Sequence, residues 1–215
     1  CLSAFPWADF RAKRGGMKLH VVLDHDGYLP AFVRVTKARL HDSKMVKMLK
    51  LPKGSIAVFD KAYVNYSWLR TLGASGLFFV TRLKTNAVYK VLRRCPVRKG
   101  TGVTSDHVIS VTTRAGDLRL RRIGYRDSET GKFYEFLTNH FGLSPKTIAD
   151  IYKERWQIET FFRLIKQNLR LKPFVVTSEN AVLNQVYVAM VAYLILAWLK
   201  FKSGIRFSIQ QMFQL

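Results

Sequence analysis

Residues 144–171 read SPKTIADIYKERWQIETFFRLIKQNLRL and decide the class of fold. Ser144 followed by Pro145 is a typical helix start, because a Ser side chain caps the unpaired N–H groups and Pro is tolerated at the first helical position. No Gly or Pro then interrupts the pattern before Pro173. The stretch therefore predicts one long helix over its whole length.

The predicted helix has a polar face beside an apolar one. At about 100° per residue, four polar side chains fall within a sector about 60° wide: Tyr152, Arg155, Glu159 and Lys166. The neighbouring stripe is apolar and consists of Ile151, Ile158, Phe162, Ile165 and Leu169. The apolar stripe would anchor the helix in a core, and the polar face would present a carboxylate between cations. The alternative is a solvated face, because Arg155 and Glu159 form an i,i+4 pair.

Strands and helices alternate in the rest of the chain. Periodicity and turn residues predict a hairpin of strands over 18–23 and 29–36, a helix over 42–49 capped by Asp42, a strand over 55–59, a helix over 65–72, a strand over 77–82, short β runs over 85–138 and a last helix over 178–200. This order is typical of a mixed α/β core with a β-rich segment inserted before the long helix.

Asp60 follows directly after the apolar run SIAVF at residues 55–59. Such a run is typical of a buried central strand, and α/β folds place their functional sites at the carboxyl ends of such strands. Asp60 is therefore a candidate site residue, with Tyr63 three positions further on. The alternative interpretation is a carboxylate that only caps the turn after the strand.

The charge of the chain points to a polyanionic partner. The chain has 36 Lys and Arg against 14 Asp and Glu, a formal net charge of +22, yet 48% of its residues are hydrophobic. It can therefore form a core, and its basic surface favours nucleic acid first and an anionic membrane second. Its two cysteines provide neither a disulfide framework nor a zinc pattern.

The basic residues are most concentrated in the middle of the chain. Residues 82–126 hold 12 basic and 2 acidic side chains. Few aromatic residues lie among them, so the pattern indicates contact with phosphate groups rather than base reading. The DNA-binding candidates are Arg93, Arg94, Arg98, Lys99, Arg119, Arg121 and Arg122. A solvated basic face is the alternative.

The last predicted helix raises the question of a membrane. Residues 181–199 are mostly apolar and approach the length that spans a bilayer. Asn184 and Gln185 lie inside the stretch, and the rest of the chain has the composition of a soluble protein. We therefore expect a buried helix and no membrane, with a C-terminal membrane anchor as the alternative.

The candidate residues together resemble a known family. Tyr152, Arg155, Glu159 and Lys166 match the Y-x2-R-x3-E-x6-K signature of bacterial DDE transposases of the insertion-sequence-four family. Residues 60–63, DKAY, resemble the D-x-x-Y motif of that family. Stretches around the first hairpin and after Glu159 are also similar, so the resemblance extends over nearly the whole chain. Four residues at three fixed spacings make the first motif specific.

The resemblance implies a fold and a division of the chain. It implies an RNase H-like α/β core with an all-β insertion before the helix that bears the glutamate. The corresponding division is residues 1–84 for the core, 85–140 for the basic β-rich insertion and 141–215 for the C-terminal helices of the core.

The resemblance also implies a chemistry. Three carboxylates would hold two Mg²⁺ ions, for which Mn²⁺ can substitute, for in-line phosphoryl transfer on DNA. Asp60 and Glu159 would be the second and third carboxylates. Tyr63, Tyr152, Arg155 and Lys166 would support the motif and contact phosphate.

One part of the family pattern is missing. The first aspartate of the family lies on a strand before the hairpin, and residues 1–16 resemble the loop that follows that strand. The sequence begins with Cys rather than Met, so we expect a piece of a longer gene product. The remaining early carboxylates, at Asp9, Asp24, Asp26 and Asp42, are better explained by loop, turn or cap roles. We therefore expect these 215 residues to be inactive in strand cleavage.

Two function classes remain alongside the membrane alternative. The first is the catalytic domain of a transposase that cuts and joins insertion-sequence ends. Its partners would be double-stranded DNA and a second copy of the chain, in the bacterial cytoplasm at the nucleoid. The second is a catalytically dead remnant that acts only as a DNA-binding module. The missing first carboxylate discriminates between them.

Overall fold

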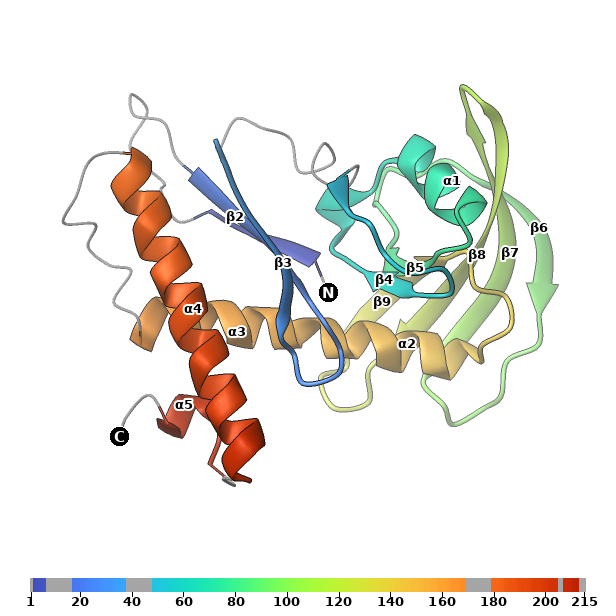
Figure 1. The fold of residues 1–215 in the computed structure, drawn as a ribbon. Coiled ribbons are helices and arrows are strands. Elements are labelled where there is room, and N and C mark those ends of the chain that lie inside the picture. Colours follow the sequence, from blue (N-terminus) through green and yellow to red (C-terminus); the bar gives the residue numbers. More distant parts are fainter. Residues whose placement is uncertain (1, 7–16, 38–47, 169–178, 205–206, 213–215) are drawn as a thin grey trace. The chain divides into compact units, whose positions relative to one another are not determined.

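The chain folds into two compact units, each with its own sheet. In a computed structural model, residues 2–6, 17–37, 48–168, 179–204 and 207–212 are described (Figure 1). One unit combines residues 3–39 with 156–215, and the other consists of residues 40–155. The first unit holds a three-stranded sheet and the second a six-stranded sheet.

The sheet of the first unit contains the predicted hairpin. Its strands are β1 (Leu2–Pro6), β2 (Met17–Leu23) and β3 (Pro30–Lys37), in that order across the sheet. Strands β2 and β3 pair antiparallel, which confirms the hairpin. At the turn between them, the N–H of Asp26 donates to Oδ1 of Asp24 at 3.2 Å. The turn roles predicted for these two aspartates are therefore confirmed.

Strand β1 differs from the expectation for the start of the chain. Residues 1–16 were expected to form a loop, but Leu2–Pro6 forms a strand beside β2. Strand formation provides hydrogen-bond partners for these backbone groups, which a loop assignment leaves unpaired. The segment reads LSAFP, so this strand carries no carboxylate.

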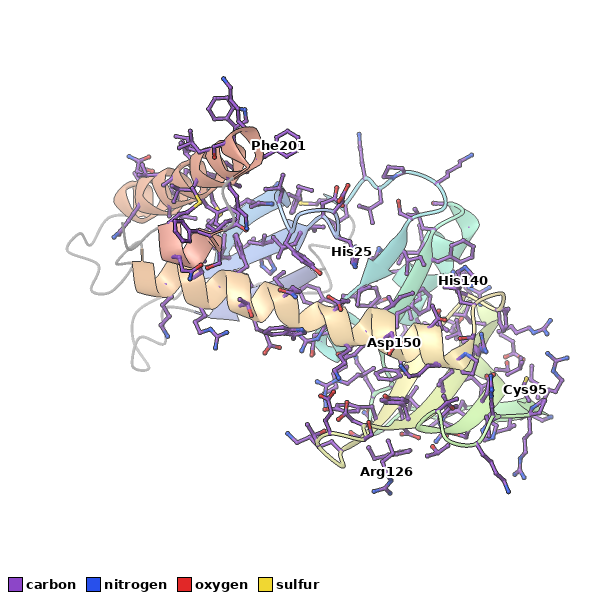
Figure 2. The ribbon with its side chains drawn as sticks, turned by 90° about the horizontal axis from the view of Figure 1, so that it is seen from below. His25, Cys95, Arg126, His140, Asp150 and Phe201 are labelled. Atoms are coloured by element: carbon purple, nitrogen blue, oxygen red, sulfur yellow. The ribbon has the colours of Figure 1, made fainter. Side chains whose placement is uncertain are left out.

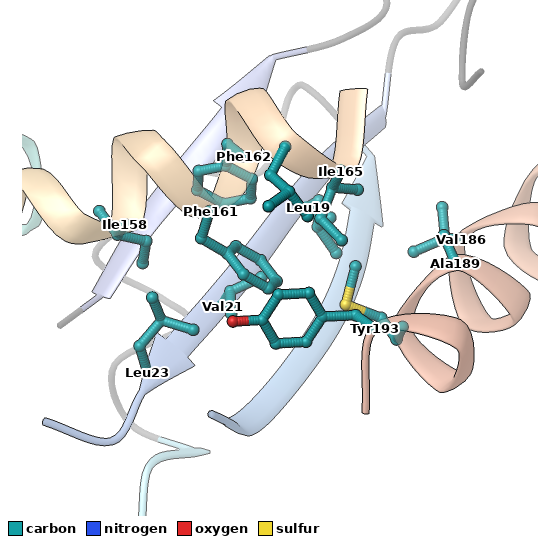
Figure 3. Close-up of a cluster of buried hydrophobic side chains, with 12 residues drawn as sticks. Leu19, Val21, Leu23, Ile158, Phe161, Phe162, Ile165, Val186, Ala189 and Tyr193 are labelled. Atoms are coloured by element: carbon teal, nitrogen blue, oxygen red, sulfur yellow. The ribbon is translucent and has the colours of Figure 1, made fainter. Parts of the chain in front are cut away.

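Helices α3 (Gln157–Asn168) and α4 (Glu179–Ser203) form the core of the first unit together with β2. Buried side chains from all three elements meet in one cluster (Figure 3): Leu19, Val21, Leu23, Ile158, Phe161, Phe162, Leu164, Ile165, Val186, Ala189, Met190 and Tyr193. The cluster confirms the predicted apolar stripe at Ile158, Phe162 and Ile165, whereas Leu169 lies outside the described residues. A short helix, α5 (Ile209–Met212), follows α4.

Helix α4 is buried on one side only, which corrects the prediction of a buried helix. Val186, Ala189, Met190 and Tyr193 face the core, but large apolar residues on other sides are exposed. Phe201, near the end of the helix, is 87% exposed and projects outward (Figure 2). By length and composition, Leu183–Ser203 is apolar enough to cross a membrane, and 22% of this window is buried.

The six-stranded sheet of the second unit has the order β4-β5-β9-β8-β7-β6. Its strands are β4 (Ile56–Val58), β5 (Phe78–Arg82), β6 (Lys90–Cys95), β7 (Val103–Thr113), β8 (Gly116–Arg126) and β9 (Phe133–Thr138). Strands β4 and β5 are parallel, and the other neighbours pair antiparallel. The strands predicted over 55–59, 77–82 and within 85–138 are confirmed. The helix predicted over 42–49 lies mostly outside the described residues.

Two helices cover opposite faces of this sheet. Helix α1 (Tyr66–Ala74) confirms the helix predicted over 65–72 and is capped by Asn65. Its Trp68 packs on Phe59, whose ring in turn contacts Phe79. Helix α2 (Pro145–Lys153) packs its buried side chains into a cluster that contains Val80. Because Phe79 and Val80 are adjacent on one strand, they point to opposite faces.

Strands β6 to β9 continue the sheet that begins with β4 and β5. The link is the pairing of β9 with β5, where Val80 lies opposite Thr138. The β-rich segment predicted as an insertion is therefore joined to the core strands by backbone hydrogen bonds. The compact units divide the chain after residues 39 and 155, whereas the division at 84 and 140 stays a prediction.

The long helix predicted over 144–171 is interrupted. Ser144 caps it and Pro145 begins it, as predicted. A 3₁₀ turn, η3 (Glu154–Trp156), then separates α2 from α3. A 3₁₀ turn advances about 120° per residue instead of 100°. The single 60° sector derived for an unbroken helix therefore does not hold across this turn.

Candidate active site

Asp60 lies at the carboxyl end of β4 and opens the 3₁₀ turn η2 (Lys61–Tyr63). Phe59, just before it, is fully buried and fixes the end of the strand in the core. Oδ1 of Asp60 accepts a hydrogen bond from the N–H of Ala62 at 3.1 Å. The carboxylate is thus both the cap of the turn and a group presented at the strand end, so the two sequence interpretations describe the same side chain.

Arg82 is the partner of Asp60. Val58 pairs with Val80 in the parallel register of β4 and β5. Asp60 and Arg82 each lie two residues further along, so this register places them next to each other. Nη2 of Arg82 lies 3.1 Å from Oδ2 of Asp60, and the two side chains are 33% and 26% exposed. In the sequence, Arg82 is recognisable only as part of the basic stretch over residues 82–126. No local signal identifies this pair, because the two residues are 22 positions apart.

Tyr152 and Arg155 lie in the same region of this unit. Tyr152 is buried at the end of α2, with its ring centroid 4.9 Å from that of Phe136. The guanidinium of Arg155 lies 5.5 Å from the centroid of the Tyr152 ring. Burial raises the pKa of Tyr152, the cations of Arg155 and Arg82 oppose that rise, and Asp60 adds to it. These four residues therefore form one electrostatic group.

Tyr63 is a core residue in this structure. It is only 1% exposed, at the end of η2. Nζ of Lys84 donates to the carbonyl oxygen of Val64 at 2.9 Å and so holds the segment that follows. The side chain of Tyr63 supports the turn that Asp60 caps. A direct contact with phosphate, as predicted, would require its hydroxyl to be uncovered.

Glu159 and Lys166 belong to α3, in the first unit. The buried neighbour Ile158 anchors the helix, and Glu159 lies on its exposed side. Lys166 is half-buried two turns further on. Seven residues of regular helix correspond to about 700°, so these two side chains share a face. The structure thus places Tyr152 and Arg155 in one unit and Glu159 and Lys166 in the other.

Five of the seven predicted DNA-binding residues are exposed. Arg93 and Arg94 lie on β6, an edge strand of the six-stranded sheet. Arg98 and Lys99 lie in the loop after β6, and Arg119 lies on β8. The exposed set consists of Arg93, Arg94, Arg98, Lys99 and Arg119. Figure 2 shows side chains of these strands projecting from both faces of the sheet. Charged side chains on an edge strand also discourage pairing with another chain.

Arg121 is buried, which corrects its prediction as a DNA-binding residue. Its side chain forms a buried ion pair with Asp106, and its Nη1 donates to the carbonyl oxygen of Leu143 at 2.6 Å. A guanidinium satisfied in this way has no surface to offer to phosphate. Arg121 therefore ties strands β7 and β8 to the segment before α2.

Arg122 is also engaged inside the protein. It forms an ion pair with Glu135, its guanidinium lies 5.6 Å from the ring centroid of Tyr89, and Nη1 lies 3.3 Å from Nδ1 of His107. Desolvation and the cations of Arg122 and Arg94 lower the pKa of His107, so the neutral ring is favoured. A phosphate contact by Arg122 would have to replace these partners.

Comparison with known proteins identifies the family. The family model of the transposase DDE domain matches residues 5–195, which include Asp60 and Glu159. The chain belongs to the transposase DDE domain family. The motif-based recognition of a DDE transposase is therefore confirmed.

Relatives of this DDE domain carry the name of transposase. A candidate transposase from Sinorhizobium fredii, y4zB, is 36% identical over 198 residues, which are 88% of this chain and 55% of that protein. A probable transposase for insertion sequence element IS5377 from Geobacillus stearothermophilus is 35% identical, over 90% of this chain and 52% of that protein. A candidate transposase for IS4SA from Synechocystis is 26% identical over 171 residues, 78% of this chain and 48% of that protein. The chain thus spans about half the length of the curated relatives it matches.

A DDE domain implies divalent metal ions, and the described residues meet that requirement only in part. Carboxylate oxygens are the ligands that Mg²⁺ prefers, and Asp60 and Glu159 provide them. However, the described part of the chain has no group of three or more His, Cys, Asp or Glu that could hold a metal ion. Both oxygens of Asp60 are also engaged, by Ala62 and Arg82. In the described part of the chain, the fit to a two-metal site is therefore incomplete.

Proposed function

We propose that this DDE domain is the catalytic part of an insertion-sequence transposase, which cleaves element ends and joins them to target DNA. The observation that carries the proposal is the family match over residues 5–195, which includes a carboxylate at the end of β4 and another on α3. Asp60 and Glu159 are the two metal-binding catalytic carboxylates of the proposal. The insertion-sequence-four family is its more specific assignment, based on the Y-x2-R-x3-E-x6-K motif.

The proposal gives the neighbouring polar residues supporting roles. Arg155 and Lys166 are cations suited to holding DNA phosphates. The ring of Tyr152 lies beneath the guanidinium of Arg155 and positions it. Tyr63 supports the turn at Asp60 from the core. Two Mg²⁺ ions, or Mn²⁺ in their place, would supply Lewis-acid chemistry for phosphoryl transfer. The first carboxylate of the family pattern is assigned to none of the described residues.

The proposed substrate is double-stranded DNA, both at the element ends and at the target. The net charge of +22 and the exposed cations of β6, its following loop and β8 support this part of the proposal. The proposal also includes a homodimer as the active assembly, no membrane, and a location in the bacterial cytoplasm at the nucleoid. These features rest on the family.

A second candidate function is a DNA-binding module without chemistry. The observation that favours it is the lack of a group of three metal-binding side chains in the part of the chain that the structure describes. Under this alternative, the exposed cations would still bind DNA. Asp60 and Glu159 would have no joint role.

Binding of Mn²⁺ discriminates between the two functions. Paramagnetic broadening of backbone amide signals should be followed at Ala62, whose N–H donates to Asp60, and at Thr160, next to Glu159. The catalytic proposal expects both amides to broaden over one concentration range. It also expects Glu159→Gln to weaken the broadening at Ala62. Glu129→Gln, an exposed carboxylate on a turn of the second unit, is the matched control and should have no effect.

The results that contradict the catalytic proposal are equally specific. If Glu159→Gln leaves the Mn²⁺ affinity at Ala62 unchanged, the two carboxylates do not share a metal. Retained DNA binding would then support the binding module. Loss of DNA binding as well would reject both functions.

A further inference from the structure

In this structure, a cation of the protein itself neutralises the carboxylate of Asp60. Oδ1 accepts from the N–H of Ala62 and Oδ2 is paired with Nη2 of Arg82, each at 3.1 Å. A divalent cation at Asp60 would use the same oxygens and would be repelled by the guanidinium. Arg82 and a metal ion therefore compete for one carboxylate.

The contact between Arg82 and Asp60 has the features of an exchangeable pair. It consists of a single N–H···O contact instead of the two parallel bonds of a bidentate pair. Both side chains are partly exposed, and partly exposed ion pairs are weak. Nε of Arg82 is buried and has no hydrogen-bond partner among the described residues. Asp60 therefore uses only the Nη2 nitrogen of the guanidinium.

The surroundings of Arg82 favour an anion. Lys61 is exposed next to Asp60, and the cation of Arg155 lies over Tyr152 in the same electrostatic group. A guanidinium matches the geometry of a phosphate or sulfate group through its parallel N–H donors. An oxyanion in this place would offer Arg82 more hydrogen bonds than one oxygen of Asp60 provides.

We propose that Arg82 is a positioning residue, which holds Asp60 in an ion pair until a tetrahedral oxyanion such as a DNA phosphate takes the guanidinium and leaves the carboxylate to a divalent cation. The inference rests on the proposed function, because it takes Asp60 as the metal-binding carboxylate. Displacement of Arg82 from Asp60 would couple the binding of an anion to the binding of a cation at the end of β4. By linkage, each ligand raises the affinity for the other by the same factor.

The test is a titration with Mn²⁺, read at the amide of Ala62, in sodium chloride and in sodium sulfate at equal ionic strength. In chloride, Arg82→Gln should bind Mn²⁺ roughly 1.5-fold to fivefold more tightly than the unmodified chain, the range expected for loss of one partly exposed ion pair. Sulfate should raise the affinity of the unmodified chain and leave that of Arg82→Gln unchanged. Arg93→Gln on β6 removes the same charge from an exposed position and is the matched control.

Three results separate failure of this inference from failure of the proposed function. If Arg82→Gln and Arg93→Gln changed the Mn²⁺ affinity equally, the change would come from net charge alone, and the inference would be overturned. A sulfate-independent affinity of the unmodified chain would also overturn it, even if Arg82→Gln failed to fold. If Asp60→Asn leaves the broadening at Ala62 intact, Asp60 is not the metal ligand, and the proposed function fails at this residue.

Discussion

Arg121 donates two parallel hydrogen bonds to Asp106, from Nε to Oδ1 at 2.8 Å and from Nη2 to Oδ2 at 2.7 Å. Both side chains are buried, and the third nitrogen of the guanidinium donates to the carbonyl of Leu143. The pair connects neighbouring strands β7 and β8 and also anchors the segment that leads into α2. It is therefore a structural contact of the second unit.

Replacement of Arg121 should destabilise the protein rather than weaken DNA binding. Arg121→Met leaves the carboxylate of Asp106 buried without its partner, which costs about 3–5 kcal/mol. Urea denaturation measures this loss. Arg119→Met, on the same strand but exposed, is the matched control and should change the free energy of unfolding by less than about 0.5 kcal/mol. Unchanged stability with weaker DNA binding in Arg121→Met would restore the original DNA assignment.

The exposed cations of β6 should contribute to the salt dependence of DNA binding. Each phosphate contact contributes a slope of roughly 0.9 in log affinity against log salt. The double variant Arg93→Met/Arg94→Met should therefore reduce the slope by about 1.8 for any duplex sequence, as measured by fluorescence anisotropy. Lys200→Met/Lys202→Met on α4 removes the same charge and serves as the control. Equal slopes in both double variants would show that net charge, not this strand, determines binding.

Asp127 should make the stability of the protein sensitive to acid. Its Oδ1 accepts hydrogen bonds from the N–H groups of Glu129 and Thr130 and from the hydroxyl of Thr130. The bonds from Thr130 are the main cause that lowers the pKa of Asp127 below its ordinary value, and Lys153 adds to the effect. The folded pKa lies below the unfolded one, so this stabilisation is complete above about pH 4 and is lost as the pH falls further.

The variant Asp127→Asn should therefore show a smaller decrease in melting temperature between pH 5 and pH 3 than the unmodified chain. Asp150→Asn changes the same charge on an exposed side of α2 and should retain the original decrease. Melting curves recorded by circular dichroism provide the measurement. If the melting temperature of Asp127→Asn decreased as much as that of the unmodified chain, other carboxylates would be responsible for the acid sensitivity.

Helix α4 should respond differently to charge on its two sides. Met190 is 4% exposed and packs in the cluster with α3 and β2, whereas Val188 is 67% exposed. Met190→Lys should cost about 3 kcal/mol or more, and Val188→Lys should be nearly neutral. Melting curves measure the stability of both variants, and vesicle flotation measures their binding to bilayers. If α4 spanned a membrane, both lysine substitutions would reduce bilayer binding. Binding to vesicles that Val188→Lys abolishes would support the membrane alternative.

The 215 residues should bind duplex DNA without cutting it in Mg²⁺ or Mn²⁺. The physical reason is that two-metal cleavage needs more carboxylates than the described residues bring together. A supercoiled plasmid that carries the element ends provides the assay, since a single nick relaxes it. Nicking that disappears in Glu159→Gln would contradict the expectation and would show a complete site.

The sequence by itself determined the features that depend on neighbouring residues. Ser144 and Pro145 begin α2, and Asn65 caps α1, because capping needs only a side chain within three positions of its N–H partner. The apolar run before Asp60 is a strand, and Asp60 is at its end. The apolar stripe of α3 is buried, because a period of 3.6 residues fixes which side chains share a face.

Only the tertiary structure decided which charged groups meet. Arg119 and Arg121 have the same charge and lie two positions apart on β8, yet one is exposed and the other pairs with Asp106. Asp60 meets Arg82 because β4 and β5 align in parallel register. Strand register and the burial of a face arise from contacts between distant segments, and a local charge pattern carries no information about them.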